Sequence, residues 1–195
     1  IRLTRETQLE VFAGESLART AVFARQHALT GLEFAHGIPG TLGGGVYMNA
    51  GAYGGELRQV VQSVTALTLD GALRQFTAAD CALGYRSSVF QRTPCVIVSV
   101  QLQLQGGDPD EIGETMRALM EKRKASQPLE LPSAGSTFKR PEGYFAGPLI
   151  EQAGLKGEGF GGAQVSKKHA GFIVNTGGAT TADILKTIEL VQTRV

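Results

Sequence analysis

The feature that most constrains this chain is a glycine-rich stretch from Gly37 to Gly55. Glycine occupies eight of its nineteen positions, and large side chains such as Ile38, Tyr47 and Tyr53 interrupt the run. A flexible linker would be small and polar throughout. Glycine lets the backbone adopt positive φ and lets another group lie against the main chain. The pattern predicts a fixed loop whose amide groups face an anion or a flat ring, and it leaves open a tight core crossing with no ligand.

Composition excludes several classes of protein. The 195 residues are 42% hydrophobic and 19% charged, which is enough to bury one large or two small cores. A formal net charge of +1 gives no reason to expect a nucleic-acid partner. No apolar run approaches the roughly 20 residues that span a bilayer, so we expect no membrane partner. Cys81 and Cys95 match neither a redox nor a metal-ligand spacing, which predicts reduced thiols, no metal and a cytoplasmic protein.

The first half of the chain reads as strands, hairpins and one helix. A strand is expected over residues 8–13, followed by a helix that Ser16 caps and that ends near Ala28. Within the glycine-rich stretch, only residues 46–49 look able to form a helical turn. Residues 61–69 predict a strand, and Asp70 with Gly71 predicts a type I′ hairpin turn to a return strand.

The second half is richer in helices. Residues 95–105 alternate, which predicts a strand with Val96, Val98, Val100, Leu102 and Leu104 on one face. A helix capped by Asp108 follows, then a helix over residues 144–153 that ends at Gly154. Short strands are expected at 164–166 and 171–175. Thr180 should cap a last helix with these residues facing inward: Ile184, Ile188, Val191 and Val195. We expect an α+β chain divided near Gly106 into domains of residues 1–106 and 107–195.

Several blocks, taken in order, resemble the MurB family of reductases. They are residues 37–45, residues 49–54, the pair Tyr85 and Arg86, residues 134–139, and residues 162–175. Together they cover essentially the whole chain, and residues 144–151 resemble the subtype with a compact substrate domain. The resemblance implies part of an FAD-binding domain of the vanillyl-alcohol-oxidase (PCMH) type in residues 1–106. It implies a smaller α/β substrate-binding domain in residues 107–195.

The resemblance also implies an activity. Members of the family use FAD, reduced by NADPH, to convert UDP-N-acetylglucosamine enolpyruvate to UDP-N-acetylmuramate in peptidoglycan synthesis. By resemblance the chain is therefore a UDP-N-acetylmuramate dehydrogenase, a flavoprotein expected to be a cytoplasmic monomer.

Two residues carry the chemistry that the resemblance implies. Hydride addition to the enolpyruvyl double bond creates negative charge next to a carboxylate, and Arg86 in the family's Tyr-Arg position suits its stabilisation. Ser136 matches the family's catalytic serine, which supplies the proton. Without the resemblance, Arg86 reads as a surface arginine and Ser136 as a turn residue.

Other residues are implied as ligand contacts. Those expected to bind the cofactor line the glycine-rich stretch and one later strand: Gly37, Ile38, Pro39, Gly40, Thr41, Gly43, Gly44, Asn49, Gly51, Ala52, Tyr53 and Ile97. Those expected to bind the substrate are Tyr85, Arg86, Ser136, Lys139, Arg140 and Gln164.

Two motifs of the family are absent from residues 1–195. One is an upstream Gly-Gly-Gly-Ser-Asn loop on the FAD pyrophosphate, and the other is a downstream catalytic glutamate. We therefore expect a piece of a longer protein, with weak FAD retention and negligible activity by itself. Two other functions stay open, namely a flavin oxidase of the vanillyl-alcohol-oxidase type and a non-catalytic nucleotide-sugar or flavin-binding module.

Overall fold

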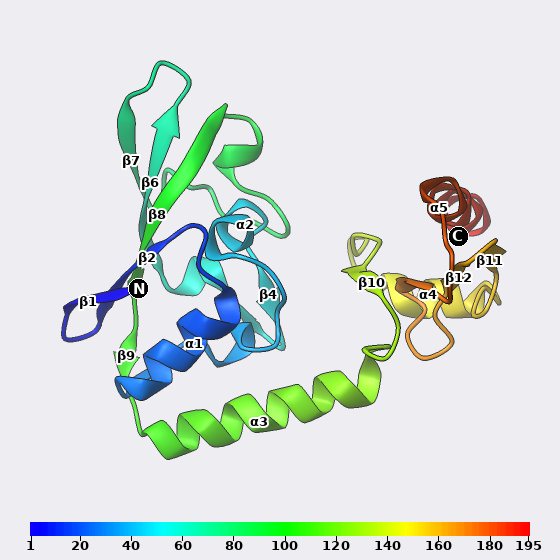
Figure 1. Cartoon of the computed structure of the whole chain (residues 1–195), viewed down its shortest axis with the longest axis horizontal. Helices are drawn as coiled ribbons and strands as arrows, with labels where there is room; N and C mark the ends of the chain where they lie inside the picture. The colour runs from blue at the N-terminus through cyan, green and yellow to red at the C-terminus, as the bar shows by residue number, and fades with distance from the viewer. The chain divides into compact units, whose positions relative to one another are not determined.

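A computed structural model describes residues 1–195 in full and divides them into two compact units, residues 1–121 and 122–195. The first unit is built on a five-stranded antiparallel sheet in the order β1-β2-β8-β6-β7 (Figure 1). Its strands are β1 (Arg2–Arg5), β2 (Gln8–Phe12), β6 (Val61–Thr68), β7 (Leu73–Thr77) and β8 (Cys95–Gln103).

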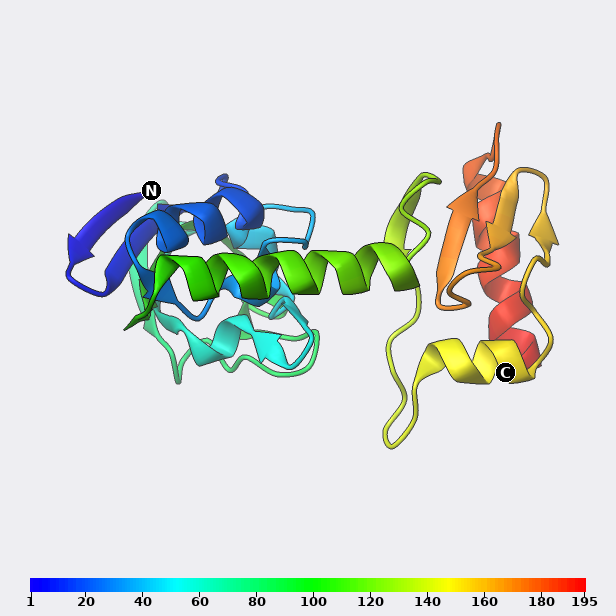
Figure 2. The same ribbon diagram turned by 90° about the horizontal axis from the view of Figure 1, so that it is seen from below.

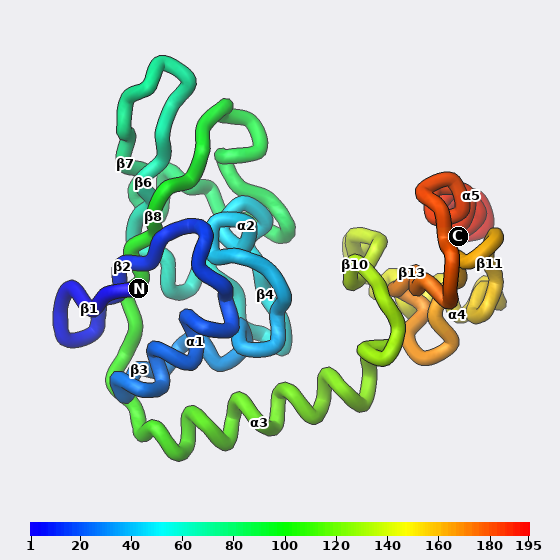
Figure 3. The backbone as a smooth tube through the Cα atoms, viewed as in Figure 1, coloured from blue at the N-terminus to red at the C-terminus, as the bar shows by residue number.

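Helix α1 (Leu17–Gln26) begins where the sequence predicts, because the Ser16 hydroxyl accepts a hydrogen bond from the Arg19 amide at 3.0 Å. The chain can be followed from α1 through β3 to α2 and β4 along the tube in Figure 3. The remaining elements of this unit are short: β3 (Leu29–Thr30), η1 (Glu33–Ala35), α2 (Leu42–Tyr47), β4 (Gly51–Ala52), β5 (Gly55–Glu56), η2 (Leu57–Gln59), η3 (Val89–Gln91) and β9 (Gln105–Gly106).

The core of the first unit joins the inner face of the sheet to α1 and α2. Val64, Val100 and Leu102 on the central strands are fully buried, as are Leu17 on α1 and Leu42 on α2. Fully burying such a side chain contributes about 1.5–3 kcal/mol. Leu42 belongs to the glycine-rich stretch, so its burial holds the stretch against the core.

The hairpin between β6 and β7 forms where expected, but the predicted turn type is wrong. Only Gly71 has positive φ, at +83°, whereas a type I′ turn needs it at both central residues. The Gly71 amide donates to the Thr68 carbonyl at 3.0 Å. Asp70 stabilises this arrangement, because hydrogen bonds from Thr68 and the Ala72 amide lower the pKa of its carboxyl group.

Strand β8 does not keep one apolar face along its whole length. Leu102 and Val100 are buried as predicted, but Val96 is 64% exposed. The register with β6 shifts between Thr65 and Ala66, so that Thr65 pairs with Ser99 and Ala66 with Ile97. A bulge of this kind reverses the facing of the residues beyond it, which turns Val96 outward.

Helix α3 (Pro109–Ser126) carries the division between the units, which falls between Glu121 and Lys122. This is later than the boundary near Gly106 suggested by the sequence, because Ile112 and Met116 are buried in the first core. Asp108 caps the helix through hydrogen bonds from the amides of residues 110 and 111 at 2.8 and 3.1 Å.

The second unit has a four-stranded antiparallel sheet in the order β10-β13-β12-β11, seen from another side in Figure 2. Its small core gathers residues from the sheet and the helices: Ile150, Leu155, Val165, Ala170 and Val191. The elements are β10 (Ser133–Ser136), α4 (Ala146–Gln152), β11 (Gly159–Phe160), β12 (Ala163–Val165), β13 (Phe172–Asn175) and α5 (Thr181–Arg194).

Helix α5 starts as predicted but turns a different face inward. Thr180 and Asp183 form a reciprocal capping box, and the Thr180 amide and hydroxyl lower the pKa of the Asp183 carboxyl group. The buried positions are Thr187 and Val191, whereas Ile184 is 38% exposed and Val195 57% exposed. The prediction that Ile184 and Val195 face inward is wrong. Thr187 takes the inward position over β12, and its hydroxyl donates to the Asp183 carbonyl of the same helix.

Candidate functional site

The glycine-rich stretch folds into a short helix followed by a small hairpin. Thr41 caps α2 by accepting a hydrogen bond from the Gly44 amide at 3.3 Å. The prediction that only residues 46–49 form a helical turn is wrong, since α2 starts at Leu42 and passes through three consecutive glycines. Each glycine costs a helix about 1 kcal/mol relative to alanine, so other contacts must compensate for them.

Several of the glycines are required by packing inside the protein. A Cβ added at Gly43 would lie 2.8 Å from the Cβ of Ala13, and one at Gly45 would lie 3.0 Å from a leucine side chain. In the hairpin of β4 and β5, a Cβ at Gly55 would lie 2.4 Å from the Phe34 ring. A side chain at any of these positions would force its neighbours to shift, so here the stretch is a tight core crossing.

Other glycines face open space. Gly40 has a φ of +131° and Gly54 a φ of +85°, and a Cβ at either would meet nothing within 4 Å. Gly44 is exposed on α2, as are its neighbours Pro39 and Thr41. This part of the stretch presents bare main chain, against which a flat ring can lie closely. The arrangement fits the isoalloxazine ring or another flat part of a flavin.

The amide groups at the start of α2 are used within the protein. The Leu42 amide donates to the Glu15 carbonyl at 2.7 Å, and the Gly43 amide donates to the Ala13 carbonyl at 2.9 Å. The prediction of amides that face a ligand is therefore wrong for these two residues. Their hydrogen bonds hold the helix against the end of β2.

The neighbouring glycines of α2 provide a matched test of these two roles. We expect Gly43→Ala to lower the free energy of unfolding by about 1–3 kcal/mol, because its Cβ overpacks the contact with Ala13. Gly44→Ala should raise it by about 0.5–1 kcal/mol, because an exposed helix position gains propensity. Urea unfolding of the two variants measures both effects. Equal changes in stability would contradict the division into packing and open glycines.

The buried Asn49 side chain links the glycine-rich stretch to the segments of Glu56, Arg58 and Gly84. Its side chain is 0% exposed, and its amide nitrogen donates to Glu56 Oε2 at 2.8 Å and to the Gly84 carbonyl at 3.0 Å. Its Oδ1 accepts from the Arg58 amide at 2.9 Å. Arg58 Nε lies 2.5 Å from the other oxygen of Glu56 and neutralises that carboxylate. Both amide hydrogens of Asn49 are thus used inside the protein, where they shape the loop.

Arg86 contacts the backbone of Asn49, and its guanidinium forms no ion pair with a carboxylate. Its Nη1 donates to the Asn49 carbonyl at 3.2 Å and its Nη2 to the Gly51 carbonyl at 2.9 Å. Its guanidinium carbon is 5.4 Å from the centre of the Tyr85 ring. These partners are all neutral, and Arg86 is half-buried. A guanidinium held by neutral groups keeps its full attraction for an incoming carboxylate.

Three of the five non-glycine residues with positive φ lie in the same segments, and the other two are Ala28 and Ala82. Asn49, Tyr53 and Arg86 have φ values of +41°, +54° and +50°. Left-handed backbone costs roughly 1–2 kcal/mol for residues other than glycine. Such strain persists only where surrounding contacts enforce it, and it concentrates at functional sites.

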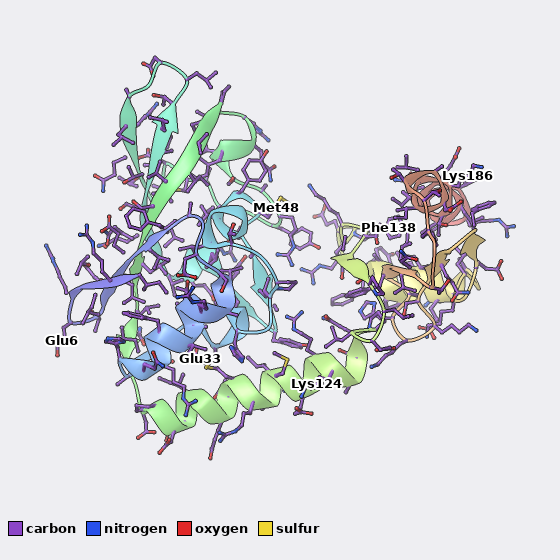
Figure 4. The ribbon with its side chains drawn as sticks, viewed as in Figure 1. Glu6, Glu33, Met48, Lys124, Phe138 and Lys186 are labelled. Carbon is purple, nitrogen blue, oxygen red and sulfur yellow. The ribbon has the colours of Figure 1, made fainter.

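Exposed apolar side chains lie on Tyr85 and on the glycine-rich stretch that Arg86 contacts. Tyr47 and Met48 at the end of α2 are 42% and 36% exposed, and Tyr53 and Tyr85 are 45% and 47% exposed. Figure 4 labels Met48 among the side chains of this part of the unit. A cation beside an exposed aromatic ring suits an organic anion better than a free inorganic ion.

The remaining cofactor-contact predictions fall into two environments. Ile38 and Ile97 are half-buried and pack against the first core, Ile97 opposite Ala66 on β6. Gly51 and Ala52 form β4 and pair with β5. Gly37 is half-exposed at the start of the stretch.

Ser136 lies in the second unit on a fixed backbone. It pairs with Phe172 at the end of β10, and the next amide, that of Thr137, donates to the Gly171 carbonyl at 2.8 Å. A register shift precedes it, where Gly135 has a φ of +85°. The serine itself is exposed. A rigid main chain with an exposed hydroxyl is suited to a residue that acts on a ligand.

The other predicted substrate contacts of this unit differ in their exposure to solvent. Lys139 and Arg140 are exposed, and the Arg140 guanidinium lies 5.1 Å from the Phe145 ring. The Gln164 amide donates to the Gly157 carbonyl at 2.8 Å, so it supports a loop of its own unit. His169 accepts from the Gly171 amide through Nδ1 at 3.1 Å, which makes it a structural residue at the start of β13.

The thiols and possible metal ligands suggest no further chemistry. Burial raises the pKa of the Cys81 thiol to about 11, so the thiol is protonated and is no nucleophile at neutral pH. Cys95 is a half-buried free thiol. Within residues 1–195 no group of three His, Cys, Asp or Glu side chains could hold a metal ion. None of the helices is both long and apolar enough to cross a membrane.

Polar residues that no sequence motif indicates organise the surroundings of Arg86. Glu56 and Arg58 fix Asn49, and the buried Ser88 donates to the Tyr47 carbonyl at 2.8 Å. Gln91 donates to the Arg86 carbonyl at 3.1 Å. The contact of Ser88 with Tyr47 joins residues 41 positions apart. The others join residues two to nine positions apart, but they follow no periodic pattern that a sequence would show.

Comparison with known proteins matches both units to one enzyme. Residues 2–77 match a profile described as an FAD binding domain, and residues 127–195 match the C-terminal domain of UDP-N-acetylenolpyruvoylglucosamine reductase. The reductase of Alkaliphilus oremlandii is 52% identical over 94% of this chain, and the chain covers 60% of that relative's length. The reductase of Limosilactobacillus reuteri is 50% identical over 100% of this chain and 68% of its own length.

A solved structure agrees with these relatives. The UDP-N-acetylenolpyruvylglucosamine reductase (MurB) of Thermus caldophilus superposes with a TM-score of 0.88 at 34% identity, over 99% of this chain and 71% of its own. Both the mixed helix-and-sheet fold and the flavin-domain class expected from the sequence are confirmed. The chain belongs to the UDP-N-acetylenolpyruvoylglucosamine reductase (MurB) family.

Proposed function

We propose that this chain forms part of an NADPH-dependent flavoenzyme that reduces UDP-N-acetylglucosamine enolpyruvate to UDP-N-acetylmuramate in peptidoglycan synthesis. The chain spans about 60% of the length of the first curated relatives it matches, so the activity belongs to the complete polypeptide. The observation that carries the proposal is the guanidinium of Arg86, which donates to neutral carbonyl oxygens and lies beside the exposed Tyr85 ring.

FAD fits the open part of the glycine-rich stretch. Gly40, Gly44 and Gly54 present bare backbone to the cofactor, with Tyr53 beside them. The bound flavin supplies hydride, which it receives from NADPH. The packing glycines, Gly43 and Gly51 among them, hold the stretch in shape against the core.

Arg86 binds the carboxylate of the enolpyruvyl group in this proposal. When hydride adds to the terminal carbon of the double bond, negative charge moves onto the carbon that bears the carboxylate and onto the carboxylate oxygens. A fixed guanidinium stabilises that charge without reorganising. Tyr85, whose ring lies beside the guanidinium, contacts the same group.

Ser136 supplies the proton that completes the reduction. Its hydroxyl proton moves to the carbon that bears the carboxylate, which leaves a saturated lactyl ether. A serine hydroxyl is a weak acid, so nearby positive charge must stabilise the oxygen it leaves behind. We propose Lys139 and Arg140 for this role and as contacts of the nucleotide phosphates, since both are exposed on the segment that follows β10. We also propose that the enzyme is a cytoplasmic monomer.

The test uses the complete polypeptide loaded with FAD. We expect NADPH to be oxidised only when UDP-N-acetylglucosamine enolpyruvate is present, in a one-to-one ratio with UDP-N-acetylmuramate formed. Titration calorimetry with the same substrate measures binding separately. Binding without NADPH oxidation would favour a non-catalytic nucleotide-sugar module, and flavin reduction by an alcohol would favour an oxidase.

A further inference from the structure

Arg86 is held in its strained conformation by two carboxamide side chains that lie on either side of it. Asn49 donates to the Gly84 carbonyl at 3.0 Å, two residues before Arg86. Gln91 donates to the carbonyl of Arg86 itself at 3.1 Å. The segment between them is closed by reciprocal hydrogen bonds of Gly84 and Ser87 at 3.1 and 3.2 Å.

The two carboxamides also tie this segment to the glycine-rich stretch. Gln91 donates to the Tyr47 carbonyl at 3.2 Å as well, at the end of α2. Asn49 provides its own carbonyl oxygen to the Arg86 guanidinium. These hydrogen bonds hold both ends of the turn around Arg86. They therefore fix the position of the guanidinium relative to the open backbone of the glycine-rich stretch.

We propose that Asn49 and Gln91 are positioning residues that hold Arg86 in the left-handed conformation from which its guanidinium meets the substrate carboxylate. The inference rests on the role given to Arg86 in the proposed function. Neither side chain touches the substrate. They act through main-chain carbonyl groups, and replacing the amide donor is therefore enough to remove the effect.

Gln91 offers the sharper test, because its side chain is exposed and Gln91→Met keeps its length without a donor. In the complete FAD-loaded enzyme we expect Gln91→Met to slow reoxidation of the reduced flavin by the enolpyruvyl substrate by about 10- to 100-fold, as misplacement of a catalytic group by about 1 Å does. Reduction of the flavin by NADPH should stay unchanged. Gln75→Ala, which removes an exposed amide on β7, is the control and should match wild type in both half-reactions.

A double-mutant cycle separates positioning from any other role. If Gln91 acts through Arg86, Gln91→Met should have no further effect in an Arg86→Ala background. Additive losses would overturn the inference, and so would a wild-type reoxidation rate in Gln91→Met. Asn49→Leu, which removes both donors without adding a charge beside Glu56, should lower the same rate and interact with Arg86→Ala in the same way.

Amide hydrogen exchange provides a readout that needs no activity. Exchange at Gly84 and Ser87 should become about 10-fold faster in Gln91→Met, because local opening is easier without the brace. Unchanged exchange would overturn the inference. Faster exchange, together with a wild-type enzyme whose flavin the enolpyruvyl substrate does not reoxidise, would reject the proposed function while leaving the bracing of Arg86 intact.

Discussion

Ser136→Ala should leave an enzyme that accepts electrons from NADPH but hardly passes them on. We expect reoxidation of the reduced flavin by the enolpyruvyl substrate to fall by about 10²- to 10⁴-fold, the usual contribution of a positioned proton donor. Flavin reduction should keep its wild-type rate, because that step needs no proton from Ser136. Stopped-flow absorbance of the flavin follows the two half-reactions separately.

The structure makes this substitution a clean test. Ser136 is exposed, and its main chain is held by β13 rather than by its own hydroxyl. Alanine therefore removes the proton donor without loosening the strand. Ser133→Ala changes an exposed serine of the same strand and should alter either rate by no more than about twofold, as most surface substitutions do. A Ser136→Ala enzyme that reduces the double bond at the wild-type rate would remove Ser136 from the mechanism.

Local signals predicted the helix starts and several strands well. Ser16, Asp108 and Thr180 each cap a helix as expected, because an oxygen side chain before a helical segment has first-turn amides to accept from. The strand over Gln8–Phe12 and the hairpin at Gly71 also form where expected. In each case, the decisive contact lies within a few residues in sequence.

The predictions from sequence are wrong where a contact between distant residues determines the local structure. Helix α2 contains three glycines, which local propensity disfavours, and it exists because Gly43 packs on Ala13. The outward turn of Val96 depends on a bulge in the pairing of β8 with β6. Both contacts join segments tens of residues apart.

The candidate site likewise combines residues that a local motif indicates with surroundings that it does not indicate. Motif resemblance selects Arg86 and Ser136, but their surroundings depend on long-range contacts. Asn49 was assigned to the cofactor from its motif, whereas the structure uses its amide hydrogens on Glu56 and Gly84. The hydrogen bonds within the loop therefore account for asparagine at position 49, which the motif had assigned to cofactor binding.

Arg86→Lys tests whether the shape of the cation matters as well as its charge. Lysine keeps the positive charge but has one nitrogen in place of the guanidinium fork. It therefore loses at least one of the hydrogen bonds to the carbonyl oxygens of Asn49 and Gly51, and with it the fixed direction toward a carboxylate. We expect the rate of flavin reoxidation by the enolpyruvyl substrate to fall by about 10²- to 10³-fold, which is typical of losing one preorganised electrostatic group.

The companion measurements decide what the loss means. KM for the substrate should rise together with the fall in rate, because the same fork binds the ground-state carboxylate and the charge that develops on it. Reduction of the flavin by NADPH should be unaffected. Arg92→Lys, an exposed arginine six residues along the same segment, should behave as wild type in every measurement. A lysine variant with wild-type kinetics would mean that charge alone suffices, and the fixed guanidinium geometry would then have no catalytic purpose.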